Sequence, residues 1–307
     1  MAFFSMLVAV ALEQVRPLRQ PLPHYRAYAR ATRWLEAKLN GGDYSHGVLA
    51  WGVAVIPLLL GVWLVASVLA SIHPVFAWVW NTGVLYFTLG FKYYSDDAEA
   101  IARVLRSGDI DAARDRMARW LGGRRGADAE MSSDDMIRVT IEQVFSASLR
   151  QMFGVLFWFV VFLGAGPVGA VLYRATSILA RRWTQNEFGE FARTAFHLIN
   201  WLPARLTALT YAIAGDFEDA MYCWRTQAAA WPDQEAGIVL AAGAGATGVQ
   251  LGMPLSVGGT VRDRPELGLN QTPEPDHIDS AVSMVWRGLT IWLVVGILLV
   301  IAGWAAA

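Results

Sequence analysis

Long apolar runs with short polar breaks characterise the first third of the chain. Residues 47–72 contain no charged side chain and exceed the ~20 residues with which a helix crosses the hydrocarbon layer of a bilayer. His73 and Pro74 interrupt this run, because proline cannot continue a helix without losing a hydrogen bond, and the apolar pattern resumes over residues 75–91. The pattern predicts a transmembrane hairpin over residues 47–91.

A last apolar run lies at the C-terminal end of the sequence. It covers residues 289–307 and follows Arg287. Trp292 and Trp304 stand near its two ends, and indole side chains favour the headgroup level of a membrane. The run therefore predicts a C-terminal transmembrane helix.

Two further apolar segments have interrupted or small-residue patterns. Residues 152–172 are apolar, but their middle consists of Gly164, Ala165, Gly166 and Pro167. This break predicts either a kinked span or a re-entrant segment, because broken backbone at membrane depth must be covered by protein or face a water-filled cavity. Residues 236–259 are rich in Gly and Ala, which favours close helix packing, and we predict that they are buried within the protein.

Basic side chains flank the predicted hairpin on both sides. Those before it are Arg16, Arg19, Arg26, Arg30, Arg33 and Lys38, and those after it are Lys92, Arg103, Arg106, Arg114, Arg116, Arg119, Arg124, Arg125 and Arg138. Because Lys and Arg near span ends are retained on the cytoplasmic side, both flanks are predicted to be cytoplasmic. We expect a multi-pass protein of the bacterial inner membrane.

The polar stretch over residues 93–121 spaces its apolar side chains as a helix does. A break at Ser107, Gly108 and Asp109 divides it into a predicted helical hairpin. Strand signals are nearly absent from the chain. The fold class that we predict is an all-α integral membrane protein, with transmembrane helices, a cytoplasmic helical hairpin and Gly/Pro-rich loops between residues 252 and 275.

Composition supports a bilayer as the main solvent. Of the 307 residues, 55% are hydrophobic and 14 are Trp, with a mean hydropathy of +0.36, which lies outside the range of ordinary soluble domains. A net charge of −1 argues against a nucleic-acid partner, because counterion release needs a basic surface. The single Cys223 excludes an internal disulfide framework and a multi-cysteine metal site.

Standard catalytic signatures are missing from the sequence. It has no phosphate-binding loop, dinucleotide-binding fingerprint, HExxH motif or nucleophile elbow. The five histidines have no i, i+4 pairing, which disfavours a zinc site. The pairs Asp96-Asp97 and Asp134-Asp135 could hold magnesium and a phosphate, but adjacent carboxylates at helix starts are more often caps.

An arginine in apolar surroundings is a more specific candidate for ligand binding. Arg205 follows Asn200 and Pro203 in an otherwise apolar predicted helix. A guanidinium there needs a partner, which is either an anionic ligand, a carboxylate of Asp216 or Glu218, or a phospholipid headgroup.

The same ambiguity applies to Tyr173 and Arg174, which directly follow the broken apolar segment. They are candidate ligand-binding residues. Alternatively, Tyr173 is an interfacial tyrosine and Arg174 extends its charged end to the membrane surface.

A set of short motifs continues from residue 98 to the last apolar run. It includes Trp120-Leu121-Gly122-Gly123-Arg124, Glu142-Gln143, Tyr173-Arg174-Ala175, Asn200 with Pro203-Ala204-Arg205-Leu206, Gly248-Val249-Gln250-Leu251-Gly252, Arg264-Pro265 with Gly268, and Asp276 with Ile278. These motifs resemble the CobD/CbiB family of membrane proteins over about two-thirds of the chain. The ligand-binding candidates within them are Tyr173, Arg174, Asn200, Arg205, Gln250 and Arg264.

The resemblance implies a chemistry. Members of the family are implied to make adenosylcobinamide phosphate in cobalamin synthesis, joining adenosylcobyric acid to an aminopropanol-type amine with ATP and magnesium. Under this interpretation Glu142 and Asp276 are catalytic candidates, and Asp233 and Glu235 are candidate metal ligands. ATP and magnesium are expected only if the synthase interpretation holds.

Several acidic positions of the family pattern are replaced in this chain. Residues 146–150 lack the expected Asp-Gly, residues 176–179 read Thr-Ser-Ile-Leu instead of Asn-Thr-Leu-Asp, and residues 194–196 replace paired Asp residues. Apolar neighbours cannot offset lost carboxylates in a magnesium site. Our main hypothesis is therefore a catalytically divergent protein with an accessory or signalling role like that of AmpE, a relative that this chain resembles in its opening residues 3–14.

Two alternatives stay open. One is an active synthase in which Glu142, Asp233, Glu235 and Asp276 hold the metal. The other is a small transporter or lipid-handling protein, which the break around Pro167 suggests, although the internal repeat typical of transporters is not found. The expected partners are membrane lipid and a corrinoid or cell-wall-related ligand, and a homo-oligomer stays open.

The motifs and the apolar runs together divide the chain into five parts. These are an N-terminal apolar segment with a basic cytoplasmic region (1–46), the transmembrane hairpin (47–91), a cytoplasmic helical segment (92–151), a CobD/CbiB-like core with broken apolar segments (152–288), and the C-terminal transmembrane helix (289–307).

Overall fold

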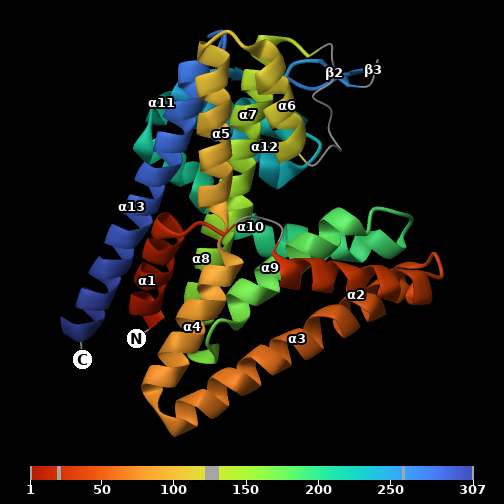
Figure 1. Ribbon diagram of the computed structural model, residues 1–307, viewed down its shortest axis with the longest axis vertical. Coiled ribbons are helices and arrows are strands. Elements are labelled where there is room, and N and C mark those ends of the chain that lie inside the picture. Colours follow the sequence, from red (N-terminus) through yellow and green to blue (C-terminus); the bar gives the residue numbers. More distant parts are fainter. Residues whose placement is uncertain (1, 19–21, 122–130, 258–259, 306–307) are drawn as a thin grey trace. The chain divides into compact units, whose positions relative to one another are not determined.

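The computed structural model describes residues 2–18, 22–121, 131–257 and 260–305 (Figure 1). Its helices are α1 (Ala2–Val15), α2 (Pro23–Leu39), α3 (Tyr44–Ile72), α4 (Pro74–Thr88), α5 (Phe91–Arg106), α6 (Ile110–Trp120), α7 (Ser133–Ser148), α8 (Gly154–Val161), α9 (Val168–Arg182), α10 (Phe188–Ala214), α11 (Phe217–Gln227), α12 (Gln234–Thr247) and α13 (Pro275–Ala305). The short strands are β1 (Gln250–Leu251), β2 (Leu255–Val257), β3 (Thr260–Arg262) and β4 (Leu267–Gly268). The predicted all-α fold class is confirmed.

The chain forms two compact units. The first comprises residues 1–93, 150–203 and 296–307, and the second comprises residues 94–149 and 204–295. Each unit therefore combines segments that are far apart in the sequence.

Three stretches of helix are long and apolar enough to cross a membrane: Tyr44–Ile72, Ser133–Val161 and Pro275–Ala302. The first and third coincide with the predicted apolar runs and are mostly exposed, with 11% and 22% of their apolar windows buried, as expected for helices that face lipid. The Ser133–Val161 window is 67% buried, so this stretch packs mainly against protein. The protein is a membrane protein.

The predicted break between the first two apolar runs lies where the sequence places it. Helix α3 ends at Ile72, and α4 begins at Pro74 in the first helical turn, where a proline loses no hydrogen bond. The His73 imidazole caps α4 by accepting a hydrogen bond from the Val75 N–H at 3.2 Å. The two helices meet at a sharp corner (Figure 1).

The apolar segment over residues 152–172 forms a helical hairpin and not a kinked helix. Helix α8 ends at Val161, and α9 starts at Val168 after a turn in which Gly166 has φ +70°. The helices pack closely because Gly169 has no side chain: a Cβ there would overlap the Trp158 carbonyl oxygen. Helix α8 continues α7 through a π-helical turn over Leu149–Phe153, so it forms the end of the Ser133–Val161 stretch.

The core of the first unit joins α3, α9 and the start of α10. Its small residues, such as Ala50 and Ala54 on α3, receive the large side chains of Trp183 and Phe188. The Trp183 indole donates a hydrogen bond to the Thr32 carbonyl on α2 at 3.4 Å. This packing fixes α2, α3 and α9 relative to one another.

The second unit is built on α12, which is buried from Glu235 to Ala246, as predicted for the first part of residues 236–259. A Cβ on Gly245 would overlap the Asp219 carbonyl oxygen of α11, and one on Gly243 would press on the Phe145 ring of α7. The helix ends at Thr247, because Gly248 adopts a left-handed conformation, but Val249, Leu251 and Leu255 beyond it are also buried. Residues 258–259 of the predicted segment lie outside the described residues. The chain then continues through Gly/Pro-rich loop and strands.

The predicted helical hairpin over residues 93–121 is present as α5 and α6. Asp109 caps α6 by accepting a hydrogen bond from the Ala112 N–H at 3.0 Å. Asp134 and Asp135 lie in the first turn of α7, as expected for residues at a helix start. Asp96 and Asp97 lie inside α5, where Asp97 is 3.6 Å from Arg116, so they are not caps.

Candidate functional site

A loop rich in glycine follows α12 in the second unit. Strand β1 pairs antiparallel with β4, so the motifs around Gly252 and Gly268 lie next to each other. Gly252 has φ +75°, and a Cβ on it would overlap the Pro265 carbonyl oxygen. The loop over residues 248–268, hereafter the glycine loop, thus requires glycine where its two arms approach most closely.

An ion pair between Glu142 and Arg264 holds this loop. The Glu142 carboxylate on α7 accepts a hydrogen bond from the Gly252 N–H at 3.0 Å and one from Arg264 Nη1 at 2.7 Å. Arg264 also donates from Nη2 to the Gly252 carbonyl at 2.9 Å and from Nε to the Met253 carbonyl at 3.1 Å. Glu142 is 6% exposed, so the pair is largely removed from water. We call these contacts the Glu142–Arg264 clamp.

Other side chains brace the same loop. The Arg264 guanidinium lies 5.8 Å from the centre of the Trp231 ring, within the range of a cation–π interaction. Gln227 on α11 donates to the Gly268 carbonyl at 3.0 Å and accepts from the Gly268 N–H at 2.6 Å. Sequence reasoning missed Gln227, because a polar residue at the end of a helix carries no pattern that points to a distant glycine.

The candidate residues of the second unit do not form one site. Gln250 donates to Glu266 at 2.5 Å at the exposed edge of the glycine loop. Asp276 lies at the exposed start of α13, where it accepts a hydrogen bond from Arg106 Nε at 2.6 Å. Arg205 is half-buried within α10.

The residues present do not fit a magnesium ion held by several protein ligands. Among the described residues there is no group of three His, Cys, Asp or Glu side chains that could hold a metal. Both oxygens of Glu142 are engaged by the clamp. Asp233 caps α12 by accepting from the Ala236 N–H at 3.0 Å, while Glu235 is buried in the first turn of that helix. We therefore assign no step to a protein-bound metal.

The first unit holds the remaining candidates. The Tyr173 hydroxyl donates to Asn200 Oδ1 at 2.8 Å, and both residues are buried. Arg174 is 4% exposed and donates from Nε to the Tyr25 hydroxyl at 3.2 Å, with its guanidinium 4.8 Å from the Tyr25 ring centre. The alternative in which Arg174 extends to the membrane surface is therefore wrong.

The Tyr173–Asn200 hydrogen bond gives a prediction for stability. Tyr173→Phe is expected to lower the free energy of unfolding by about 1–3 kcal/mol, because it leaves a buried Asn200 oxygen without this donor. Tyr222→Phe is the matched control, since Tyr222 is 57% exposed and its loss should change stability by less than about 0.5 kcal/mol. Denaturant unfolding of the purified protein in detergent measures both. Equal effects of the two changes would contradict the prediction.

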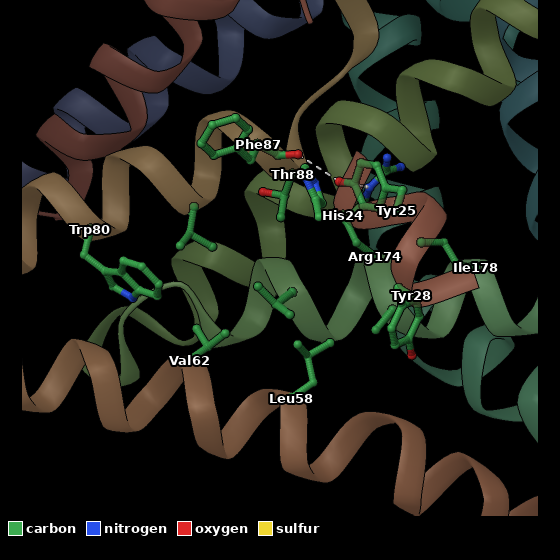
Figure 2. Close-up of a pocket in the computed structure, with 13 residues that line it drawn as sticks. His24, Tyr25, Tyr28, Leu58, Val62, Trp80, Phe87, Thr88, Arg174 and Ile178 are labelled. Atoms are coloured by element: carbon green, nitrogen blue, oxygen red, sulfur yellow. Dashed lines mark hydrogen bonds between the residues drawn. The ribbon is translucent and has the colours of Figure 1, made fainter. Parts of the chain in front are cut away.

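Arg174 and Tyr25 also border a cavity of about 410 Å³ between α2, α3, α4 and α9, all within the first unit (Figure 2). Tyr25 donates to the Phe87 carbonyl at 2.9 Å and so links α2 to α4 at the cavity wall. Burial, followed by the nearby charge of Arg174, lowers the pKa of His24. His24 is therefore neutral near pH 7 and does not add a second positive charge.

These features define a helical membrane protein with a glycine loop held by an ion pair in one unit and an arginine-bordered cavity in the other. The family model for the CobD/Cbib protein matches residues 6–285, and the chain belongs to the CobD/CbiB family. The predicted family is thus confirmed.

Curated relatives support this assignment. The cobalamin biosynthesis protein CobD of Stutzerimonas stutzeri is 36% identical, and the alignment covers 99% of each chain. The protein of the same name from Chromobacterium violaceum is 38% identical over 78% of this chain and 77% of its own. The cobalamin biosynthesis protein CbiB of Salmonella typhi is 26% identical over 80% of this chain and 76% of its own. No solved structure matches the chain.

Proposed function

We propose that this protein acts in cobalamin biosynthesis as an adenosylcobinamide-phosphate synthase of the bacterial inner membrane. The observation that carries the proposal is the 36% identity to a cobalamin biosynthesis protein over 99% of both chains. The Glu142–Arg264 clamp adds support, because it joins two motifs of the family resemblance that are 122 residues apart in the sequence. The similarity favours the synthase over the accessory role that the missing acidic positions suggested.

The reaction joins a carboxylate of adenosylcobyric acid to an aminopropanol-type amine. The family resemblance implies that ATP first phosphorylates the carboxylate and leaves as ADP. The amine then attacks the acyl phosphate, so that the C–N bond forms, the C–O bond breaks, the carboxylate oxygen leaves in inorganic phosphate and the amine releases a proton to solvent. Glu142 is then a positioning residue and not the general base, because its two oxygens already accept hydrogen bonds from Gly252 and Arg264. Its role is to fix the glycine loop.

The location in the membrane is part of the same proposal. Three candidate spans and flanking arginines support a multi-pass arrangement in the inner membrane. The partners that follow from the proposal are a corrinoid and membrane lipid.

Growth of a cobalamin-dependent strain that lacks its own synthase tests the function. The strain carrying this gene is expected to grow with cobyric acid and to accumulate cobinamide-containing corrinoids, which mass spectrometry of cell extracts detects. Supplied cobinamide is the control, because it lies after the proposed step. Growth with cobinamide but not with cobyric acid, at a normal amount of the protein in membranes, would reject the synthase.

The accessory hypothesis predicts a different outcome. An AmpE-like role requires that deletion of the gene changes β-lactamase induction in the native host while corrinoid synthesis from cobyric acid continues. Both phenotypes are measured in one deletion strain, so the two hypotheses separate there.

A further inference from the structure

The cavity in the first unit is lined mainly by apolar side chains. Those from α3, α4 and α9 include Leu58, Val62, Val84, Phe87, Val171 and Ile178. Its volume of about 410 Å³ lies within the range of pockets that bind small molecules, roughly 300–1,000 Å³. Water is a poor occupant of such a space, because each buried water needs two to four polar partners. The lining therefore favours an apolar ligand such as a hydrocarbon chain.

Two polar atoms at the cavity lack partners. The Tyr28 hydroxyl and the Trp80 Nε1–H are buried and make no hydrogen bond to any part of the chain that the structure describes. Figure 2 shows Trp80 and Tyr28 toward opposite ends of the group of lining residues. Burial raises the pKa of Tyr28, so its hydroxyl stays protonated and can donate. Both groups can donate to oxygens of a ligand.

The buried positive charge of Arg174 is the strongest indication of a ligand. Arg174 is 4% exposed and donates only to neutral acceptors, the Tyr25 hydroxyl at 3.2 Å and the Arg150 carbonyl at 3.4 Å, without an ion pair to a carboxylate of the described residues. Glu13 acts on it only at longer range, with Oε1 of Glu13 accepting from the Lys92 N–H at 3.0 Å. A buried cation without an ion pair is unfavourable, and an anionic group from outside the chain would neutralise it.

The position of the cavity indicates the source of such a ligand. Leu58 and Val62 line it from α3, the candidate span whose adjacent side chains Ile56 and Leu60 are 53% and 57% exposed. One side of this helix therefore faces lipid while another faces the cavity. The substrates of the proposed reaction are rich in amide, phosphate or ammonium groups and do not suit these apolar walls.

We propose that the cavity binds one acyl chain of an anionic membrane phospholipid, with its phosphate held by Arg174. The acyl chain of the lipid occupies the apolar space between α3, α4 and α9, and its phosphate neutralises the buried Arg174 guanidinium. Ester oxygens of the lipid accept hydrogen bonds from the unpartnered donors at the wall. The site is independent of the corrinoid chemistry proposed above.

Photolabelling in vesicles tests the site. The full-length protein is reconstituted in phosphatidylethanolamine and phosphatidylglycerol vesicles that contain phosphatidylglycerol with a photoreactive acyl chain, and labelled peptides are identified by mass spectrometry. Peptides of α2, α4 and α9 that line the cavity are expected to carry the label. Val62→Trp fills the space and is expected to lower this labelling about tenfold, equivalent to a tenfold weaker affinity.

A matched control keeps the test specific. Val65→Trp makes the same change on the exposed side of α3, where the valine is 38% exposed and does not line the cavity, and is expected to leave labelling unchanged. Arg174→Gln is expected to reduce labelling and Arg174→Lys to restore much of it, because lysine keeps the charge. Protein stability in detergent is measured for each variant, and only variants with unchanged unfolding are compared.

Competition identifies the ligand class. Unlabelled phosphatidylglycerol is expected to displace the label, whereas inorganic phosphate and zwitterionic phosphatidylcholine are not. Displacement by a free fatty acid but not by phosphatidylglycerol would overturn the phospholipid assignment. Equal labelling of the cavity peptides in Val62→Trp and in the original protein would overturn the site itself.

Discussion

Glu142→Ala is expected to destabilise the second unit by about 3–5 kcal/mol, because it leaves the Arg264 guanidinium partly buried without its carboxylate. The Gly252 N–H loses its acceptor at the same time. If the synthase proposal is correct, growth on cobyric acid should be lost as well, since the glycine loop is no longer fixed. Denaturant unfolding in detergent and hydrogen exchange of residues 248–268 measure the two structural effects.

A second substitution separates the unpaired charge from the lost packing. Adding Arg264→Met to Glu142→Ala removes the guanidinium, so part of the lost stability should return despite the second mutation. Asp276→Ala is the matched control: it breaks an ion pair with Arg106 in which the Asp276 side chain is 79% exposed, and should cost less than about 1 kcal/mol. A loss below 1 kcal/mol for Glu142→Ala would show that the clamp does not hold the loop.

The sequence predicts those parts of the fold that depend on interactions between residues close together in the chain. The corner between α3 and α4 follows from His73 and Pro74, because capping and the missing proline N–H act within one helical turn. The buried state of α12 follows from its Gly and Ala content. Its end at Gly248 was missed, because a left-handed glycine and a glycine that packs two helices look the same in a sequence.

The candidate site was only partly predictable for a different reason. Glu142 and Arg264 were both candidates from the family resemblance, but no periodicity relates residues that are 122 positions apart, so their pairing came from the structure alone. Arg174 was assigned either to a ligand or to the membrane surface, and only its burial decided against the surface. Tyr28 and Trp80 were not candidates, because nothing in a sequence shows that a donor lacks an acceptor.

The missing carboxylates of the family pattern do not by themselves show that catalysis is lost. Each replacement would remove a metal ligand only if all acidic residues of the family motifs contacted a metal. In this structure two of the acidic candidates have structural roles: Glu142 holds the glycine loop and Asp233 caps α12. The number of carboxylates in a motif therefore does not measure the capacity for catalysis, and similarity over the whole chain is the stronger guide.

Gly252→Ala is expected to destabilise the glycine loop by more than conformational strain alone. At φ +75° an alanine is strained by about 1–2 kcal/mol, and its Cβ would in addition overlap the Pro265 carbonyl oxygen. The overlap is removed only if the two backbone arms of the loop separate. This separation would break the hydrogen bonds from Gly252 N–H to Glu142 and from Arg264 to the Gly252 carbonyl. We expect a total loss above about 4 kcal/mol.

Gly108→Ala distinguishes the overlap from the conformational strain. Gly108 has φ +78°, close to that of Gly252, but a Cβ there would meet no atom within 4 Å. The free energy of unfolding of this control should therefore fall only by the strain of about 1–2 kcal/mol, and growth on cobyric acid should be unchanged. Denaturant unfolding of the two variants in the same detergent gives the comparison. Equal losses would mean that the approach of Pro265 to Gly252 adjusts easily, and that the loop tolerates a side chain without releasing the clamp.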